Sequence, residues 1–537
     1  MQWEQLDCAL RLSLEAPDRM HPTSFGFDQK HSQRKGRHVL NALHTPLRLH
    51  KKIILFIFVS LVLLHTWVPA AAAGLNDTDV LQQRQAMHSS AVNDIQATSM
   101  VPYYTIDGTV NPDPKKLTFT ATETIVYTNR TSVALQNIGL RLYPNLTDVG
   151  GSCILTTVKV DGSVVTPKYG PQRYFVTVPL AQKLAAGKSV TLQIGFTTTA
   201  PTNADSNLFG TLVWDGTTLS MPYAYPMIAY LRGGMWDTTI PDSKGDIVSS
   251  EVSMYDVTLR GPSRGYTFVS TGSTLNTNTT GAEQSVRIYS GLQRDFAFAL
   301  TKLIKKSQTV AGTTINVYGP ASRASVTNAA LAAAVAAVPI FNARIGQYPY
   351  NELDIISVDA GDFWGIEFPS FVLIEQDQYK INPDFEHLIV HEVGHQWFYN
   401  VIGNDVQRDA FVDEGLANYT ELLYDQARNR ATDAAGTIRY WKDDLDALRD
   451  NGNDGIVDQS IDVMSDDQYS TLSYSKAALY IDGVRLQIGE AAFATALKSY
   501  FTASKYRNVD GTAFRSAAQT ACNCNLVSLY TQWILLK

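Results

Sequence analysis

The chain has 537 residues, of which 45% are hydrophobic and 18% are charged, a composition typical of a globular protein. This length allows about two to four domains, and the composition excludes a disordered or fibrous chain. The formal net charge is −7, and residues 1–52 alone carry nine Lys or Arg against five Asp or Glu, so the rest of the chain is acidic. Nucleic-acid binding needs a basic face for the phosphates, and because the body is acidic we expect no nucleic-acid partner.

A signal for export lies near the N-terminus. Residues 1–52 form a basic N-terminal leader that ends in two lysines, and residues 53–73 contain no Asp, Glu, Lys or Arg and end in four alanines. A basic flank, an apolar stretch and small residues are typical of a secretory signal, cleaved here near Ala72 or Ala73, or of an uncleaved signal-anchor helix. Both alternatives predict an extracytoplasmic body, either secreted or held in the membrane by residues 53–73.

The exported body begins with a stretch that we interpret as a linker, residues 74–100, because it is polar and only weakly periodic. From residue 101 the pattern changes to alternation of apolar and polar residues, as in Leu117–Thr128 and Val190–Phe196. A period of two is typical of β-strands with one buried face. Residues 101–303 are therefore predicted to form an antiparallel, β-sandwich-like domain.

Residues 304–537 have a largely helical pattern and are predicted to form an α-rich domain. Ala324–Ile345 is rich in alanine, and we expect Pro339 to kink or end this helix because proline removes a backbone donor. Leu353–Val358 is predicted to be a short strand, and several helices follow from Asp384 onward. The fold class is therefore α+β, with a β domain followed by an α-rich domain.

The four cysteines are too few for a disulfide scaffold, and none forms a C-x-x-C pair of the kind that binds zinc. Three of them lie in the exported body: Cys153, Cys522 and Cys524. The sequence leaves open whether two of these form a disulfide or all of them remain buried thiols.

Histidines mark the chemistry of the second domain, because the last 449 residues contain only His387, His391 and His395. The motif His391-Glu392-Val-Gly-His395 places two imidazoles one turn apart on one helix face, where they can share a zinc ion, with Glu392 as the general base. His387 lies about 12 Å from His395 along the helix axis, which is too far to bind the same ion. We therefore expect His387 either to have no role in the site or to contact the metal ligands without binding the metal. A third ligand must come from another element, and Glu414, which opens the next helical pattern, is well placed.

The motif H-E-x-x-H, followed by eighteen residues and a glutamate, resembles the aminopeptidase-N-like family of zinc metallopeptidases. Here these residues are His391, Glu392, His395 and Glu414. The Gln-Trp-Phe segment after the second histidine and the Asp-Glu-Gly-Leu-Ala segment around Glu414 also look like the family's. The resemblance covers about residues 100–530. It implies that the α-rich domain is a thermolysin-like catalytic domain, with one Zn²⁺ per chain held by the two histidines and Glu414.

Two further motifs resemble that family. Gly-Ile-Glu-Phe-Pro, which starts at Gly365, is similar to the family's Gly-x-Met-Glu-Asn exopeptidase motif. This implies that Gly365 and Glu367 bind the substrate's free α-ammonium end. Tyr-Ser-Lys-Ala, which starts at Tyr474, is similar to a segment that carries a catalytic tyrosine, whose hydroxyl would donate to the oxyanion. Tyr469 is expected to line the same pocket, and Asp409 to orient a ligand histidine.

The chain departs from the longer members of the family in two places. Their acid-rich Asp-Glu-Pro segment is replaced by Tyr225–Tyr230, which leaves a second amine anchor in the β domain unassigned. The chain also ends soon after the catalytic domain, so we expect the short, bacterial-type form without the large C-terminal helical domain, and a more open site.

The sequence thus predicts a zinc metallopeptidase, and specifically an aminopeptidase that releases N-terminal residues from peptides with a free N-terminus. Within the enzyme class two alternatives stay open, an endopeptidase and a hydrolase that uses the same zinc site on a non-peptide substrate. The non-enzymatic alternative is an inactive, exported binding module. That alternative predicts loss of Glu392, Glu414 or Tyr474, and all three are present.

Overall fold

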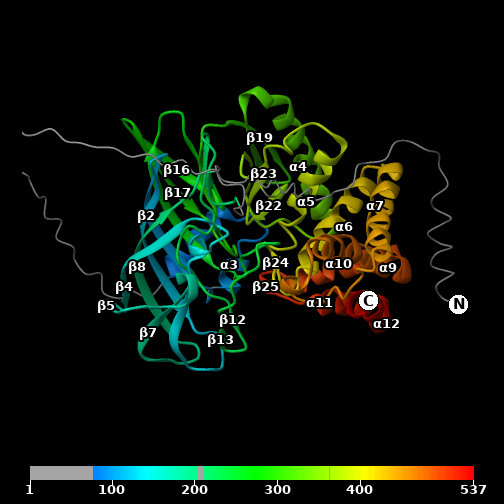
Figure 1. Cartoon of the computed structure of the whole chain (residues 1–537), viewed down its shortest axis with the longest axis horizontal. Helices are drawn as coiled ribbons and strands as arrows, with labels where there is room; N and C mark the ends of the chain where they lie inside the picture. Colours follow the sequence, from blue (N-terminus) through cyan, green and yellow to red (C-terminus); the bar gives the residue numbers. More distant parts are fainter. Residues whose placement is uncertain (1–76, 99, 203–209, 362, 537) are drawn as a thin grey trace, which may run out of the picture. The chain divides into compact units, whose positions relative to one another are not determined.

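A computed structural model describes residues 77–98, 100–202, 210–361 and 363–536. The predicted basic leader, residues 1–52, and the predicted signal sequence or anchor, residues 53–73, lie outside the described residues. In Figure 1 the strands of the blue, cyan and green part of the chain gather on one side, and the helices of the yellow to red part gather on the other. The element order confirms the predicted α+β class, with a β domain followed by an α-rich domain.

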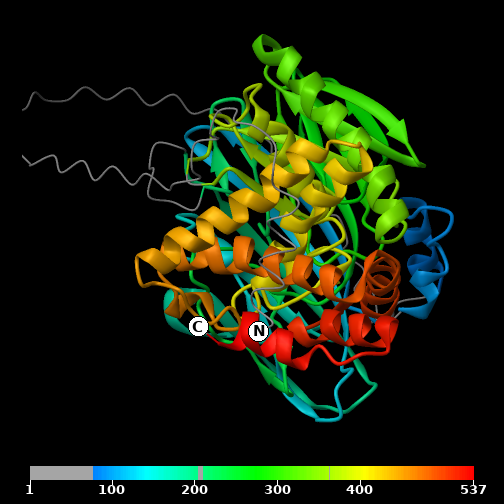
Figure 2. The same cartoon turned by 90° about the vertical axis from the view of Figure 1, so that its right-hand side faces the viewer.

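The prediction of a linker over residues 74–100 is wrong for the part of this stretch that the structure describes. This part forms three short helices, α2 (Asp77–Gln82), η1 (Gln83–Ala86) and α3 (Asp94–Ala97). Four of its apolar side chains are buried in the larger core: Val80, Met87, Ala91 and Ile95. Lys505 also forms an ion pair with Asp94, and Figure 2 shows the blue segment beside the red C-terminal helices. The apolar residues are too few and too unevenly spaced to give a period, which is why the composition suggested a linker.

The β domain is built on an eight-stranded sheet with the order β16-β17-β14-β1-β2-β8-β4-β5. Most neighbours are antiparallel as predicted, but β1 and β14 pair in parallel. Burial alternates residue by residue along β8, so one face of the sheet lies against the domain core. The strands are β1 (Tyr103–Asp113), β2 (Lys116–Thr128), β4 (Ser152–Val160), β5 (Ser163–Val164), β8 (Ser189–Thr199), β14 (Met254–Pro262), β16 (Ser273–Thr280) and β17 (Glu283–Tyr289).

A two-stranded sheet of β12 (Leu231–Arg232) and β13 (Met235–Trp236) and two four-stranded sheets complete the domain. The four-stranded sheets have the orders β15-β18-β10-β9 and β11-β3-β7-β6. Their strands are β3 (Leu135–Arg141), β6 (Lys168–Tyr169), β7 (Phe175–Leu184), β9 (Val213–Trp214), β10 (Thr218–Ser220), β11 (Met227–Ile228), β15 (Thr267–Ser270) and β18 (Phe298–Thr301). Phe119 of the large sheet packs edge-on against Phe298 of β18, with ring centroids 5.0 Å apart. Contacts of this kind fill the space between sheets, as the sandwich-like prediction requires.

The α-rich domain begins with a five-stranded sheet of order β19-β20-β21-β23-β22. Its strands are β19 (Ile304–Val310), β20 (Thr313–Gly319), β21 (Glu352–Val358), β22 (Gly365–Phe368) and β23 (Phe371–Glu375). The strand β22 lies at the edge of the sheet and pairs antiparallel with β23. Glu367 lies on this edge strand, which therefore brings the predicted amine anchor to the border between sheet and helices.

Most of the rest of this domain is helical, apart from the short paired strands β24 (Ile402–Gly403) and β25 (Arg507–Asn508). Its longer helices are α4 (Ala324–Arg344), α5 (Pro383–Gly394), α6 (Phe411–Ala427), α7 (Ala431–Asp450), α9 (Ala477–Ile488), α10 (Glu490–Ser504) and α11 (Gly511–Cys522). The helix α4 runs through Pro339, so the proline does not end it. Buried side chains on both sides of the proline, such as Ala334 and Phe341, hold the helix in the core and offset the missing hydrogen bond. Among the described residues Ala321–Arg344 is long and apolar enough to cross a membrane, but its buried face is that of a core helix.

The structure also decides the state of the three cysteines in the described chain. Cys522 and Cys524 form a disulfide, and Cys153 is a free, buried thiol on β4.

Candidate active site

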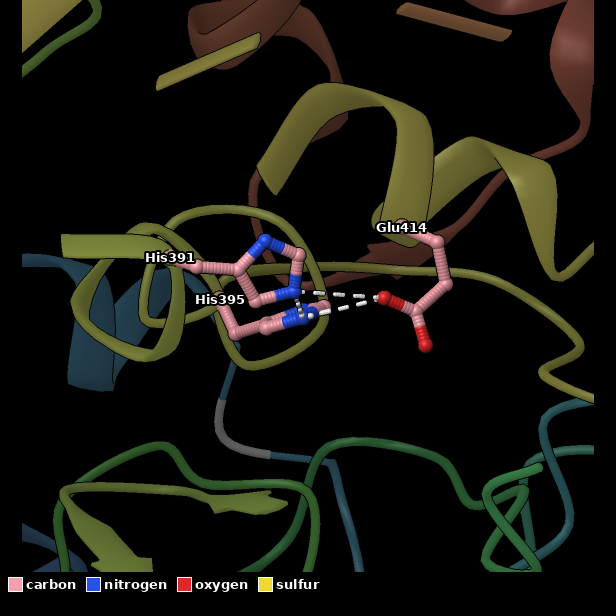
Figure 3. A group of neighbouring side chains, drawn as sticks. All are labelled: His391, His395 and Glu414. Atoms are coloured by element: carbon pink, nitrogen blue, oxygen red, sulfur yellow. Dashed lines mark hydrogen bonds and ion pairs between the residues drawn. The ribbon is translucent and has the colours of Figure 1, made fainter. Parts of the chain in front are cut away.

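The helix α5 carries His391, and His395 is the residue that caps its C-terminal end. Asn382 caps its start, accepting a hydrogen bond from the backbone N–H of Phe385 at 2.7 Å. Ile389, Val390 and Val393 are buried in the core, so the opposite side of the helix presents His391 and His395. Their Nε2 atoms lie 3.0 Å apart and point toward the same place, as Figure 3 shows.

The third predicted ligand comes from the start of α6. Glu414 Oε2 lies 3.3 Å from Nε2 of His395 and 3.5 Å from Nε2 of His391. The two helices approach closely because Gly394 has no side chain: a Cβ there would lie 2.4 Å from Oγ1 of Thr420 on α6. Spacing in the sequence and close packing of α5 on α6 together bring the three ligand atoms within 4.8 Å of one another.

These three residues fit a divalent cation. Burial would raise the pKa of Glu414, but the two imidazoles hold it down to about 2, so the carboxylate is charged. Its Oε2 accepts no hydrogen bond from the residues that the structure describes, although it is buried. One cation at the point where this carboxylate oxygen and the two imidazole nitrogens converge would satisfy all three atoms. Two histidines and one glutamate are the donor set of many catalytic zinc sites.

The remaining ring nitrogens are held by other groups. Nδ1 of His395 lies 3.0 Å from the backbone carbonyl of Phe398, and Nδ1 of His391 lies 3.4 Å from Oε1 of Glu421. Such contacts place the proton on Nδ1 and leave Nε2 free to bind a metal. Glu421 was not predicted from the sequence to belong to the site, although it lies seven residues after Glu414 and therefore on the same face of α6.

The predicted role of Asp409 is wrong. Asp409 lies in the turn before α6, where its backbone carbonyl accepts a hydrogen bond from Asn404. Glu421 contacts His391 in its place because it lies on the helix that faces α5. His387 lies outside the ligand cluster, as expected, and its Nε2 is 3.1 Å from Oδ2 of Asp425.

Glu392 lies beside the edge strand β22. A Cβ on Gly365 would be 2.3 Å from its Oε1, so the absence of a side chain at Gly365 makes room for the carboxyl group. Burial raises the pKa of Glu392 to about 8, and its Oε2 has no hydrogen-bond partner within the described chain. A buried carboxyl group whose pKa lies near neutrality can both accept and release a proton.

Two further carboxyl groups, those of Glu367 and Asp246, lie beside the metal ligands, one from each domain. Oε1 of Glu367 lies 3.6 Å from Nδ1 of His395 and accepts no hydrogen bond from the described residues. Asp246, from the β domain, shares a hydrogen bond with Glu367, and burial, with the nearby charge of Glu414, raises the pKa of Asp246 to about 7. The backbone carbonyl of Asp246 accepts a hydrogen bond from Gln407 Nε2 at 2.6 Å, which fixes this loop against the catalytic domain.

Asp246 is a residue that the sequence did not reveal. It lies far from the motifs in the chain, in an irregular segment with no periodicity. The acidic group also includes Asp413, whose Oδ1 accepts a hydrogen bond from Asn404. Glu367, His395 and Asp413 are close enough to hold a second ion, but Nδ1 of His395 already contacts the Phe398 carbonyl and is therefore protonated.

Two tyrosines of the π-helical segment η6 (Tyr469–Lys476), Tyr469 and Tyr474, lie beside the metal ligand Glu414. The hydroxyl of Tyr474 donates to Oε1 of Glu414, and that of Tyr469 lies 3.4 Å from the same oxygen. Burial and the charge of Glu414 raise the pKa of Tyr474 well above its usual value, so its hydroxyl keeps its proton and remains a donor. A Cβ on Gly245 would lie 2.4 Å from the Tyr469 hydroxyl, so the Gly245–Asp246 segment of the β domain borders this pocket.

Comparison with known proteins agrees with this arrangement. Residues 330–533 match the Peptidase family M1 domain. Aminopeptidase N of Lactococcus lactis subsp. lactis is 25% identical over 249 residues, which are 43% of this chain and 29% of the relative. Endoplasmic reticulum aminopeptidase 2 of Homo sapiens is 24% identical over 233 residues, which are 40% of this chain and 24% of the relative. The chain therefore spans less than a third of the length of these two relatives.

The fold is also shared with solved structures. An M1 zinc metallopeptidase from Deinococcus radiodurans superposes with a TM-score of 0.60 and 16% identity, over 81% of this chain and 93% of that protein. A mutant of that metallopeptidase bound to a Tyr-Ser-Ala substrate superposes with a TM-score of 0.59. The chain studied here thus matches the Peptidase family M1 domain over residues 330–533 and is similar to aminopeptidase-N-like members of that family.

Proposed function

We propose that the protein is a zinc-dependent aminopeptidase that binds one Zn²⁺ per chain. The convergence of His391, His395 and Glu414 carries this proposal, because both Nε2 atoms and Oε2 are oriented toward one point while the Nδ1 atoms contact other groups. His391, His395 and Glu414 would hold the zinc ion, which would supply Lewis acidity to the peptide carbonyl and to the attacking water.

The residues around these ligands supply the proton transfers. Glu392 accepts the proton of the attacking water and delivers it to the leaving amine, a role that suits a buried carboxyl group with a pKa of about 8. Tyr474 keeps its hydroxyl proton and donates a hydrogen bond to the oxyanion that forms on the peptide carbonyl. Both side chains lie next to the ligand cluster, so no large movement is needed to bring them to a bound peptide.

The free α-ammonium of the substrate is bound by Glu367, with Asp246 as the second anchor that the sequence left unassigned. Two hydrogen-bonded carboxyl groups beside His395 form a buried acidic pocket with one oxygen still free to accept. An ammonium group satisfies this pocket, whereas a peptide chain that continues past it would bury uncharged atoms against the carboxylates. This contrast favours an aminopeptidase over an endopeptidase. The relatives named aminopeptidases support the same choice.

Replacing Glu367 tests this assignment. Glu367→Ala should lower kcat/KM for peptides with a free N-terminus by about ten- to a thousand-fold, since the charge pair with the substrate ammonium is lost. Wild-type activity on N-acetylated peptides should be low, and the substitution should hardly change it because these peptides lack the cation. Asp246→Asn should act in the same direction with a smaller effect.

Glu375→Ala is the matched control for this experiment. Glu375 is equally buried, lies on the neighbouring strand β23, and accepts hydrogen bonds from the backbone N–H groups of Ala360 and Asp377. Its loss should leave the preference for free over acetylated peptides unchanged. Wild-type enzyme that cleaves acetylated peptides as readily as free ones would rule out the aminopeptidase and leave an endopeptidase or a non-peptide hydrolase.

We further propose that the protein acts outside the cytoplasm, either secreted or anchored in the membrane by residues 53–73. The basic flank, the apolar stretch and the four alanines support this. Protease added to intact cells should digest the body of the protein, and a protected body would refute export. An N-terminus near Gly74 in the purified protein would identify a cleaved signal, and an intact residue 53–73 segment would identify an anchor.

A further inference from the structure

Three consecutive residues of the β domain, Gln293, Arg294 and Asp295, reach into the catalytic domain. We call them the bridging tripeptide. They are 0%, 2% and 1% exposed and lie between β17 and β18. The backbone of Gln293 pairs with Ser253, and the carbonyl of Arg294 accepts hydrogen bonds from the hydroxyl groups of Ser250 and Tyr255. The tripeptide backbone is therefore fixed in the β domain while its side chains point elsewhere.

Gln293 holds the hairpin that carries the amine anchor. Its Nε2 donates to Oγ of Ser370 at 2.7 Å, and Ser370 lies in the turn between β22 and β23, three residues after Glu367. The same Oγ lies 3.1 Å from the hydroxyl of Tyr348. Ser370 has a φ of 55°, a left-handed conformation that is unfavourable for a serine and persists only where the surroundings impose it.

Arg294 holds the turn that follows the metal-binding helix. Its Nε donates to the carbonyl of Tyr399 at 2.6 Å and its Nη2 to the carbonyl of Arg507 at 2.7 Å, and it also bonds the side chain of Asn508. A Cβ on Gly403 would lie 2.0 Å from the Arg294 guanidinium carbon, so only glycine leaves room for this side chain. One guanidinium group thus joins the β domain to two separate segments of the catalytic domain.

Asp295 holds the same turn from its other side. The hydroxyl of Tyr399 donates to Oδ2 of Asp295 at 2.5 Å, so Tyr399 is fixed both by its carbonyl and by its side chain. Tyr399 has a φ of 130°, which again needs support from its surroundings. Its neighbour Phe398 provides the carbonyl that contacts Nδ1 of His395, and the N–H of Asn400 donates to the carbonyl of His395 at 3.1 Å. The position of this turn therefore sets the orientation of a metal ligand.

We infer that the bridging tripeptide is a positioning device that fixes the amine anchor Glu367 relative to the metal ligand His395. This inference rests on the proposed aminopeptidase function. An exopeptidase must keep a constant distance between the group that binds the ammonium and the group that acts on the first peptide bond, and a shift of about 1 Å can lower the rate about a hundredfold.

Gln396 joins the two elements directly, since it accepts from the N–H of Ser370 and donates to the carbonyl of Phe368. The tripeptide adds a second connection from outside the catalytic domain. One segment of the β domain contacts both the anchor hairpin and the turn after the metal-binding helix, and it therefore links their positions. Gln293, Arg294 and Asp295 are positioning residues in this account, because they act through Ser370 and Tyr399.

Two substitutions test separately the contact of the tripeptide with the anchor hairpin and its contact with the turn after the metal-binding helix. Gln293→Met keeps the size of the side chain but removes the bond to Ser370. It should raise KM for free-amine peptides about three- to thirty-fold and lower the preference for free-amine over acetylated peptides by the same factor. The zinc dissociation constant should stay unchanged. Arg294→Lys keeps the charge but cannot reach all the acceptors. It should raise the zinc dissociation constant about tenfold, measured by competition with a chromophoric chelator.

The β domain offers matched controls for both variants. Gln284 is buried, and its Nε2 bonds carbonyls of Pro262 and Tyr266 within the same domain. Arg141 is buried and bonds Tyr143 and Asp237, also within that domain. Gln284→Met and Arg141→Lys should lower Tm but change neither the substrate preference nor the zinc affinity.

The inference is overturned if Gln293→Met and Arg294→Lys lower only Tm, as the controls do, because the tripeptide is then merely structural. If Arg294→Lys fails to fold, Tyr399→Phe can replace it, because this change removes only the hydroxyl group that donates a hydrogen bond to Asp295. Tyr399→Phe should also raise the zinc dissociation constant, but by a smaller factor. Wild-type enzyme without a preference for free-amine peptides would refute the proposed function by itself. In that case the zinc affinities still decide whether the tripeptide positions His395.

Discussion

Both domains bury a glutamate, but in opposite electrostatic surroundings. Glu123 on β2 of the β domain is 2% exposed, and Glu414 of the catalytic domain is 4% exposed. Both carboxyl oxygens of Glu123 lack hydrogen-bond partners within the described chain, and burial raises its pKa well above the usual value. For Glu414 burial acts in the same direction, but two imidazoles outweigh it and hold the pKa at about 2.

The comparison shows that burial alone does not make a carboxylate functional. Glu123 is surrounded by the apolar core of the β domain and keeps its proton, so it is a neutral core residue. Glu414 is charged because other elements bring two nitrogen ligands to it. Substitutions that treat the two glutamates alike should therefore have very different consequences.

The largest effect is expected from Glu414→Gln. The change removes the charge that completes the ligand set, so the purified protein should contain almost no zinc and lose about a thousandfold or more of its activity. Metal analysis and hydrolysis of a free-amine peptide measure the two effects. Glu123→Gln is the matched control and should retain both zinc and activity. The proposed ligand set is refuted if Glu414→Gln keeps a full equivalent of zinc.

A smaller effect is expected from Glu392→Gln, which removes the proton acceptor but no ligand. The variant should keep its zinc while kcat falls about a hundred- to ten-thousandfold. The comparison with Glu414→Gln separates catalysis from metal binding within one site. If Glu392→Gln lost zinc as Glu414→Gln does, Glu392 would belong to the ligand set and another base would be needed.

The smallest effect is expected from Glu123→Gln, and it concerns stability. A carboxyl group whose pKa is raised on folding favours the folded state below its unfolded pKa, near 4.5, and this contribution is lost as pH rises toward the folded pKa. The wild type should therefore lose up to about 1.4 kcal/mol of unfolding free energy per pH unit relative to Glu123→Gln above that value. Urea unfolding of both proteins from pH 4 to pH 8 measures this. Parallel stability curves would show that Glu123 is not a neutral buried acid.

Much of the site could be predicted because its signal is local. His391, Glu392 and His395 lie within one helix turn, and the eighteen-residue spacing leads to Glu414, so their meeting depends on two adjacent helices. The alternation of strands such as β8 likewise reflects a single buried sheet face, which the sequence records residue by residue.

The parts that could not be predicted depend on tertiary contacts. Asp246 joins the acidic pocket from an irregular loop of the other domain, and no periodicity places such a residue. The bridging tripeptide contacts residues about 75 to 215 positions away, such as Ser370 and Asn508. Glu421 is different, because its spacing from Glu414 on one helix face would have placed it near His391 had that spacing been considered.

Zinc content, measured together with activity, tests the account most directly. Purified wild-type protein should contain one zinc per chain by metal analysis, and a strong chelator should remove the zinc and the hydrolysis of free-amine peptides together. Added zinc should restore both. A protein that contains no zinc and hydrolyses these peptides equally well with and without the chelator would contradict the proposed role of His391, His395 and Glu414.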